Sequence, residues 1–154
     1  ALSNWIVSFL GQPLVDALGW DIEMSLENIL GFILYPFTLI IGVPIKDAGL
    51  VAKLLGERLV VTELVSYQHL AGLISDGILT DTRSIVLATY ALCGFAHVAS
   101  LAIFVGGISA LVPQRTKDLS GLGFRALFSA TLACFMTAAV AGVFYSSGDT
   151  VLFR

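Results

Sequence analysis

The sequence predicts an all-α integral membrane protein that combines transmembrane helices with a re-entrant helical hairpin and a discontinuous, unwound helix. Hydrophobic residues make up 57% of the chain and charged residues 12%, whereas a typical soluble domain has about 25% charged residues. Too little polar surface remains to coat a soluble globule, and the mean hydropathy of +0.93 agrees with a membrane location. In addition, residues 84–114 contain no Asp, Glu, Lys or Arg, yet they hold polar residues at their centre.

Residues 1–45 are predicted to hold the end of one membrane helix, a cytoplasmic connection and a full transmembrane helix. The charge-free residues 1–15 are too short to span a bilayer. We therefore expect them to end a helix that begins outside this sequence, so that the chain is a piece of a longer polypeptide. After an acidic connection, residues 28–45 are again free of charge and just long enough to cross, with Pro36 as a possible kink.

Residues 46–80 are predicted to form the re-entrant helical hairpin. Its arms, residues 46–60 and 64–75, would be about 22 Å and 18 Å long, too short for a hydrocarbon core of about 30 Å. Glu63 lies between the arms, farthest from both ends. Periodicity alone favours equally an amphipathic surface helix whose charged side chains face water: Lys53, Glu57, Arg58 and Glu63.

Residues 81–114 are predicted to form the discontinuous transmembrane helix, capped at its start by Thr80 or Asp81. A straight helix over residues 84–114 would be about 46 Å long, more than one bilayer crossing needs. Gly94 stands at the centre with a histidine and a serine nearby. A helix interrupted inside a bilayer is tolerated only where it is buried in protein or lines a wet cavity, so this pattern indicates a transport pathway.

Residues 115–154 are predicted to form a basic cytoplasmic loop and a final transmembrane helix. Arg115, Lys117 and Arg125 place the loop in the cytoplasm by the positive-inside rule. The charge-free residues 126–148 are long enough to cross. Small residues occupy two adjacent ridges of this helix, which predicts close packing against a neighbour. The ridges are Ala126, Ala130, Cys134, Ala138 and Gly142, and beside them Ser129, Ala133, Thr137 and Ala141.

Several other classes of function lack their sequence signals. The net charge of −3, without a basic cluster, argues against nucleic-acid binding. No His, Cys or carboxylate spacing is typical of a metal site, and no glycine-rich phosphate loop is present. Nothing places a nucleophile on a strained turn, so we expect no enzyme. Cys93 and Cys134 lie in apolar stretches and are predicted to be packing residues rather than a disulfide.

The candidate binding residues surround the predicted break and the hairpin tip. A carboxylate at bilayer depth costs about 2.5–3.5 kcal/mol, so Glu63 should have a polar partner, and two neighbouring hydroxyls of a sugar would suit it. His97 and Ser100 share a face if the helix resumes there and would complete the site. Alternatively, His97 makes an interhelical hydrogen bond and Ser100 bonds back to its own helix. The ring of Phe95 would wall a planar ligand or simply pack.

Several motifs resemble the C-terminal part of the concentrative nucleoside transporters. They are GERLVVTELVSY at residues 56–67, TRSI at 82–85, YALCGFAH at 90–97, the glycine pair at 106–107, ALVP at 110–113 and GFRAL at 123–127. The order and spacing are similar to those of the family, and the resemblance extends over nearly the whole chain.

This resemblance implies a multi-pass importer of nucleosides in the plasma (inner) membrane, which assembles as a homotrimer and moves its transport domain like an elevator. The family builds its site from two oppositely oriented hairpins and two unwound helices, and this chain would supply the second of each. The coupling cation, sodium or proton, is expected to bind in the part of the protein absent from this sequence. No other cofactor is expected.

The resemblance also assigns roles to individual residues. Glu63 matches the hairpin glutamate that binds ribose hydroxyls, Ser100 a serine that contacts ribose, and Phe95 a phenylalanine that lines the pocket. His97 and Thr62 stand where the family usually or often has asparagine. His97 can still hydrogen-bond ribose, but it is bulkier and titratable, so we expect an altered substrate range and pH dependence. The contrasting hypothesis is a non-transporting membrane scaffold or assembly subunit, in which Glu63 and His97 only bridge helices.

Overall fold

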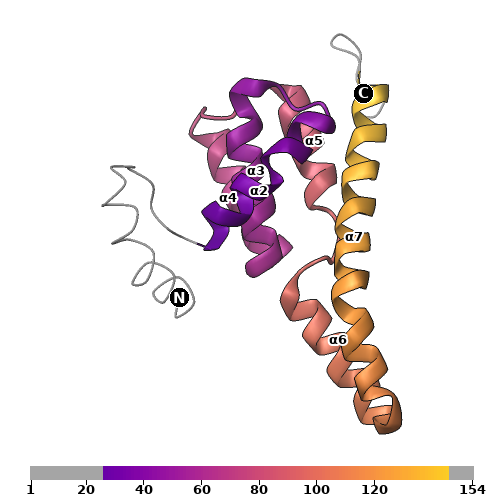
Figure 1. Cartoon of the computed structure of the whole chain (residues 1–154). Helices are drawn as coiled ribbons and strands as arrows, with labels where there is room; N and C mark the ends of the chain where they lie inside the picture. The colour runs from indigo at the N-terminus through magenta and orange to yellow at the C-terminus, as the bar shows by residue number, and fades with distance from the viewer. Residues whose placement is uncertain (1–25, 146–154) are drawn as a thin grey trace, which may run out of the picture.

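The computed structural model describes residues 26–145, and the prediction of an all-α fold is confirmed because these residues contain helices and no strand. The expected helix end at 1–15 and most of the acidic connection lie outside the described residues. The elements in chain order are α2 (Leu26–Ile40), α3 (Ile45–Val60), α4 (Glu63–Ser75), α5 (Thr82–Leu92), α6 (Val98–Leu111), the 3-10 helix η1 (Pro113–Arg115) and α7 (Thr116–Phe144) (Figure 1).

Helices α2 and α3 pack as an antiparallel pair. The pair is close because Gly31 has no side chain: a Cβ there would lie 3.1 Å from the Cα of Lys53. The turn between them needs Gly42, whose φ is +95°. Before this turn, α2 ends at Ile40 and is about 22 Å long, within the stretch 28–45 for which a full span is expected.

Helices α3 and α4 match the expected hairpin arms to within one residue. They are joined across the hairpin by a side-chain contact, in which His69 Nδ1 lies 2.8 Å from a carboxylate oxygen of Glu57. Of the four charged side chains that the alternative, an amphipathic surface helix, places in water, Lys53 is exposed, whereas Arg58 and Glu63 are shielded. The buried Arg58 is only 1% exposed, and the side chain of Glu63 is 19% exposed, so neither faces water freely.

Helices α5 and α6 lie end to end along α7 (Figure 1). Three glycines set the register, since a Cβ on each would meet a side chain of the opposite helix. The pairs are Gly142 with Leu87, Gly94 with Cys134, and Gly123 with Leu101. In these pairs the residue number on α7 decreases as the residue number of its partner increases from 87 to 101. Helix α7 is therefore antiparallel to α5 and α6. The non-helical residues 93–97 therefore lie opposite the middle of α7.

The small ridges of α7 are buried only in part. Cys134, Ala138 and Gly142 pack as predicted, and both cysteines are free. Ala126 and Ala130 are exposed, as is most of the second ridge. Toward the start of α7 the buried residues are instead Thr131 and Gly123. Gly123 faces Leu101 of α6. The prediction of tight packing is therefore confirmed for Cys134, Ala138 and Gly142 of the first ridge.

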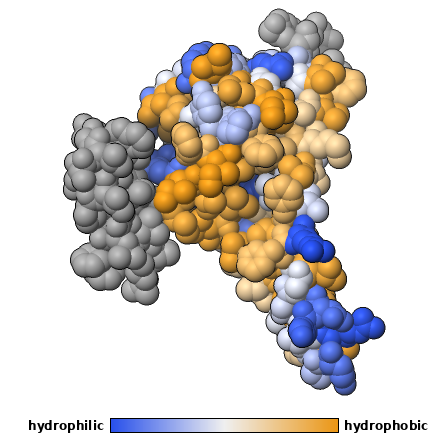
Figure 2. All heavy atoms as spheres, viewed as in Figure 1, coloured by the Kyte–Doolittle hydropathy of each residue, from blue (hydrophilic) through white to orange (hydrophobic). Residues whose placement is uncertain are grey.

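The basic segment is helical rather than a loop. Arg115 ends η1, and Lys117 and Arg125 lie on the first turns of α7. All three are exposed. In Figure 2 hydrophilic residues gather at the end of the molecule where α6 meets α7, and hydrophobic residues cover much of the rest of that face.

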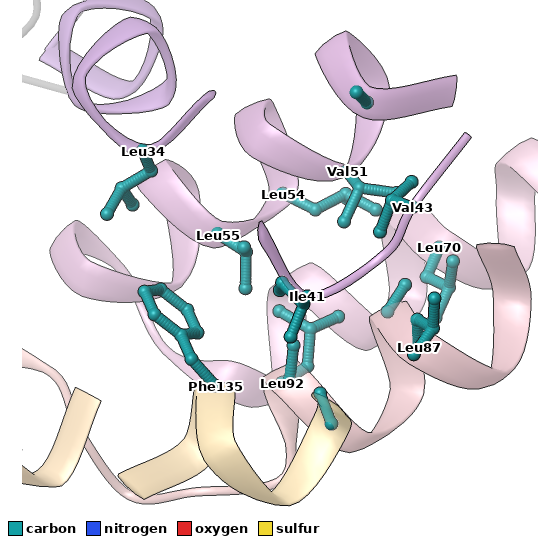
Figure 3. Close-up of a cluster of buried hydrophobic side chains, with 14 of the residues drawn as sticks. Leu34, Ile41, Val43, Val51, Leu54, Leu55, Leu70, Leu87, Leu92 and Phe135 are labelled. Atoms are coloured by element: carbon teal, nitrogen blue, oxygen red, sulfur yellow. The ribbon is translucent and has the colours of Figure 1, made fainter. Parts of the chain in front are cut away.

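The hydrophobic core lies among α2, α3, α4, α5 and α7 (Figure 3). Phe135 enters it from α7, with its ring centroid 5.7 Å from that of Phe37. Helix α6 contributes no buried residue. Within the described residues one helical stretch, Pro113–Phe144, is long and apolar enough to cross a membrane, and 28% of its most apolar window is buried. Asn28–Ile40 and Val98–Leu111 are shorter apolar helices.

The start of α5 is capped by Asp81, one of the two predicted candidates. Its carboxylate accepts hydrogen bonds from the Ser84 amide at 3.1 Å and the Ser84 hydroxyl at 2.9 Å. The same hydroxyl lies 2.6 Å from a carboxylate oxygen of the buried Asp47 on α3. The hydrogen bond from the Ser84 side chain lowers the pKa of Asp81 below its ordinary value. One serine thus joins the cap of α5 to the first turn of the hairpin.

We expect Asp81→Ala to lower the free energy of unfolding by about 1 kcal/mol, because an orphan amide of α5 loses its acceptor. Asp81→Asn should retain most of the stability, because asparagine is an equally good cap. The folded-state pKa is lowered, so the carboxylate's contribution is present above its ordinary pKa of 3.8 and is lost as pH falls through the lowered value. Thermal unfolding in detergent at several pH values measures this, and equal melting of the alanine variant would contradict it.

We expect Gly94→Ala to destabilise the protein by about 1–3 kcal/mol, because the new Cβ would clash with Cys134 Sγ. Cys134→Ala removes that sulfur, so the double variant should recover most of the loss. Gly72→Ala serves as the control, because a Cβ on that glycine meets nothing within 4 Å. A double variant no more stable than Gly94→Ala would show that the sulfur is not the obstacle.

Candidate ligand site at the hairpin tip

The candidate site forms where the tip of the α3–α4 hairpin meets the gap between α5 and α6. Glu63 is the first residue of α4, and His97 is the N-cap of α6. His97 Nε2 lies 3.0 Å from Glu63 Oε2, and the side chains are 7% and 19% exposed respectively. Residues distant in sequence are thereby brought into one polar pair, largely shielded from solvent.

The tautomer of His97 follows from its hydrogen bonds. Its Nδ1 accepts from the Ser100 amide at 3.1 Å, so in the neutral imidazole the proton lies on Nε2 and faces Glu63. The contact with Glu63 is close but not well directed, and Glu63 Oε2 is a buried oxygen that receives no hydrogen bond of good geometry. One carboxylate oxygen therefore has acceptor capacity left inside the site.

Ser100 is held by its own helix start. Its hydroxyl lies 2.8 Å from the carbonyl of His97 and 3.0 Å from that of Phe95, and it accepts from the His97 amide at 3.4 Å. With the imidazole bond this completes a capping box. The local alternative for Ser100 thus describes its present contacts. Its single proton is engaged, while the oxygen can still accept from a ligand hydroxyl.

Phe95 and Thr62 stand at the borders of the pair. Phe95 is 77% exposed, and its ring centroid lies 6.4 Å from that of His97, so an uncovered aromatic face adjoins the imidazole. Thr62 caps α4 without a side-chain hydrogen bond to the helix. The structure joins Glu63, His97, Ser100 and Phe95 through direct contacts. Thr62 adjoins them only as the neighbour of Glu63 in the chain.

Two residues near the site were not predicted from the sequence. Arg58 donates from Nη1 to the carbonyl of Ala91, and the Tyr67 hydroxyl donates to the carbonyl of Thr89 at 2.7 Å. Both acceptors belong to the last turn of α5, just before the gap. The available signal for Arg58 was a basic residue in the last turn of the first arm, close to the hairpin tip, and the surface-helix alternative placed it facing water.

Around this pair the described residues offer a ligand site rather than a metal centre. No group of three or more His, Cys, Asp and Glu residues suited to a metal occurs among residues 26–145. An apolar cavity of about 320 Å³ lies near the pair, because its lining includes Val98, which follows His97, and Val60, which lies three residues before Glu63. It is lined by Leu26, Leu30, Leu59, Val60, Val98 and Leu127.

Comparison with known proteins gives the family. The sequence profile described as "Na+ dependent nucleoside transporter C-terminus" matches residues 1–142. The chain belongs to this transporter family. It is 40% identical to solute carrier family 28 member 3 of Eptatretus stoutii, covering 94% of this chain and 22% of that protein. It is 35% identical to sodium/nucleoside cotransporter 1 of Sus scrofa, covering 94% of this chain and 24% of that protein.

A bacterial relative and two solved structures are also similar to this chain. The putative nucleoside permease NupX of Escherichia coli is 38% identical over 78% of this chain and 29% of its own length. CNTnw in an inward-facing substrate-bound state is 31% identical, with a TM-score of 0.74 over 90% of this chain and 33% of that one. A CNTnw variant in an outward-facing state is 32% identical, with a TM-score of 0.80 over 92% and 34%.

These findings settle the class of the protein. The family consists of integral membrane transporters rather than enzymes, as the composition and motifs predicted. The chain corresponds to the C-terminal portion of its relatives and spans between 22% and 34% of the length of each relative named above.

Proposed function

We propose that the full-length protein imports nucleosides by cation-coupled alternating access and that this chain forms the ribose-binding half of its site. The coupling cation is sodium or a proton, held by the part of the protein absent here. Family membership and the names of the relatives, which include a sodium/nucleoside cotransporter, support this proposal. The observation that carries it is the shielded Glu63–His97 pair between the hairpin tip and the gap.

In the membrane, α3 and α4 form the re-entrant hairpin, and α5 and α6 form one discontinuous helix. Neither arm is longer than about 24 Å, which supports a hairpin that enters and returns. Helices α5 and α6 together follow α7, the long apolar helix, as one interrupted crossing would. We place the segments 1–45, 46–80, 81–114 and 115–154 in the plasma (inner) membrane, and we expect the full-length protein to assemble as a homotrimer.

The chemistry of the site suits a ribose. Neighbouring ribose hydroxyls can both donate to the Glu63 carboxylate, and such charge-assisted bonds are stronger than neutral ones. The oxygen of Ser100 can accept from a third donor, and the Nε2 hydrogen of His97 can be donated to the sugar. The exposed ring of Phe95 borders the pair and can lie against a planar base. Thr62 flanks the carboxylate and completes the set of substrate-binding residues.

Alternating access needs a site whose occupancy favours the occluded state. In this structure the carboxylate contacts His97. A nucleoside would insert its hydroxyls between these groups and so join hairpin and helix through stronger bonds. The same close contact also favours the scaffold hypothesis, in which the pair only bridges helices. Transport measurements separate the two, and isotopic nucleoside uptake across sodium and proton gradients would identify the coupling cation.

We expect Glu63→Gln in the full-length protein to abolish uptake of uridine or adenosine, that is, to lower it by about a hundredfold or more. The amide carries no charge and replaces one acceptor oxygen with a donor, so the ribose loses two charge-assisted bonds. Uptake is measured in cells or proteoliposomes after quantifying the folded trimer. Glu57→Gln is the matched control, because Glu57 pairs with His69 on the hairpin arms. Undiminished uptake by the Glu63 variant would favour the scaffold.

We expect His97→Asn to retain transport but to change the preference between uridine and adenosine, or the pH profile of uptake. Asparagine is a strong N-cap, so α6 should still start at Val98, but the shorter amide withdraws from Glu63. His69→Asn is the control, because His69 lies on α4 with its side chain 61% exposed. Identical preference and pH profile would mean that His97 does not face the ligand.

A further inference from the structure

The last turn of α5 has carbonyl groups that no helical amide can reach, because the helix stops at Leu92. Each of three consecutive carbonyls has a partner. Thr89 accepts from the Tyr67 hydroxyl, Tyr90 from the Cys93 amide at 3.4 Å, and Ala91 from the Arg58 guanidinium. The outer two partners come from the hairpin, one from each arm. The hairpin thus replaces the hydrogen bonds that the interruption removes.

The charges of the hairpin also match the two helix ends of the gap. A helix carries partial negative charge at its C-terminus and partial positive charge at its N-terminus. Arg58 lies at the C-terminal end of α5, and Glu63 lies beside His97 at the N-terminal end of α6. Arg58 is 1% exposed, and its Nε and Nη2 groups have no partner among the described residues. Its charge is therefore balanced mainly by the end of α5.

We propose that Arg58 and Tyr67 are positioning residues of the nucleoside site, a clamp that holds Glu63 opposite His97. This proposal rests on the proposed function. The two clamp bonds and the Glu63–His97 contact join residues 58–67 of the hairpin to residues 89–97 of the interrupted helix. Loss of a clamp bond leaves the ligand to order the hairpin tip itself, and that cost weakens binding without altering any group that touches the ligand.

The clamp bonds allow conservative tests. Tyr67→Phe removes a single hydroxyl, and Tyr90→Phe is its matched control, because the Tyr90 hydroxyl makes no hydrogen bond within residues 26–145. Only one guanidinium nitrogen of Arg58 is bonded to the helix, so a lysine ammonium can make the same bond. Arg58→Met removes both the donor and the charge.

The test is the rate of uridine uptake against uridine concentration, for each full-length variant normalised to folded transporter at the membrane. We expect Tyr67→Phe to raise KM about threefold to tenfold, with the maximal rate per transporter within about twofold and with Tyr90→Phe unchanged. Arg58→Met should raise KM further, whereas the KM of Arg58→Lys should stay close to that of the wild type.

Other outcomes overturn the clamp. A Tyr67→Phe variant whose KM equals that of the wild type, or whose maximal rate alone falls, would make Tyr67 merely structural. If the KM of Arg58→Lys is no lower than that of Arg58→Met, Arg58 is likewise merely structural. Wild-type protein that takes up no nucleoside would refute the proposed function instead, so the two failures are distinguishable.

Discussion

The structure depends on how the peptide groups left unpaired by the gap between α5 and α6 find partners. An unpaired carbonyl or amide in an apolar setting costs about 1–3 kcal/mol, so an interruption at this place needs substitutes close by. On the carbonyl side they are supplied by Arg58 and Tyr67 of the hairpin. On the amide side His97 bonds Ser100 and itself contacts Glu63. Hairpin and gap therefore complete each other.

This mutual completion explains why two shielded charged residues, Arg58 and Glu63, occur near the hairpin tip. Glu63 lies in the first turn of its own helix α4 and beside the cap of α6, so two helix N-termini favour its negative charge. Arg58 lies in the last turn of α3 and at the end of α5, so two C-termini favour its positive charge. The tight turn at the tip keeps the two side chains on opposite ends of the gap.

Local signals predicted much of this arrangement. The arm boundaries followed from charge and length, the Asp81 cap from a common capping residue, and the gap from Gly94 in a run too long for one crossing. The charge-free stretch continues to residue 45, but α2 ends at Ile40, because the chain then turns at Gly42, which has a positive φ. The burial of Arg58 was missed because its acceptor is a backbone carbonyl 33 positions away, a partner that has no side-chain signature.

The imidazole of His97 serves as the cap of α6 because the cap needs only one acceptor at short reach. Nδ1 supplies that acceptor, as a side-chain carbonyl oxygen would, and the ring then carries Nε2 farther out, to 3.0 Å from Glu63. The cap thus decides which nitrogen holds the proton. Local helix geometry therefore directs Nε2, rather than Nδ1, toward the carboxylate of Glu63.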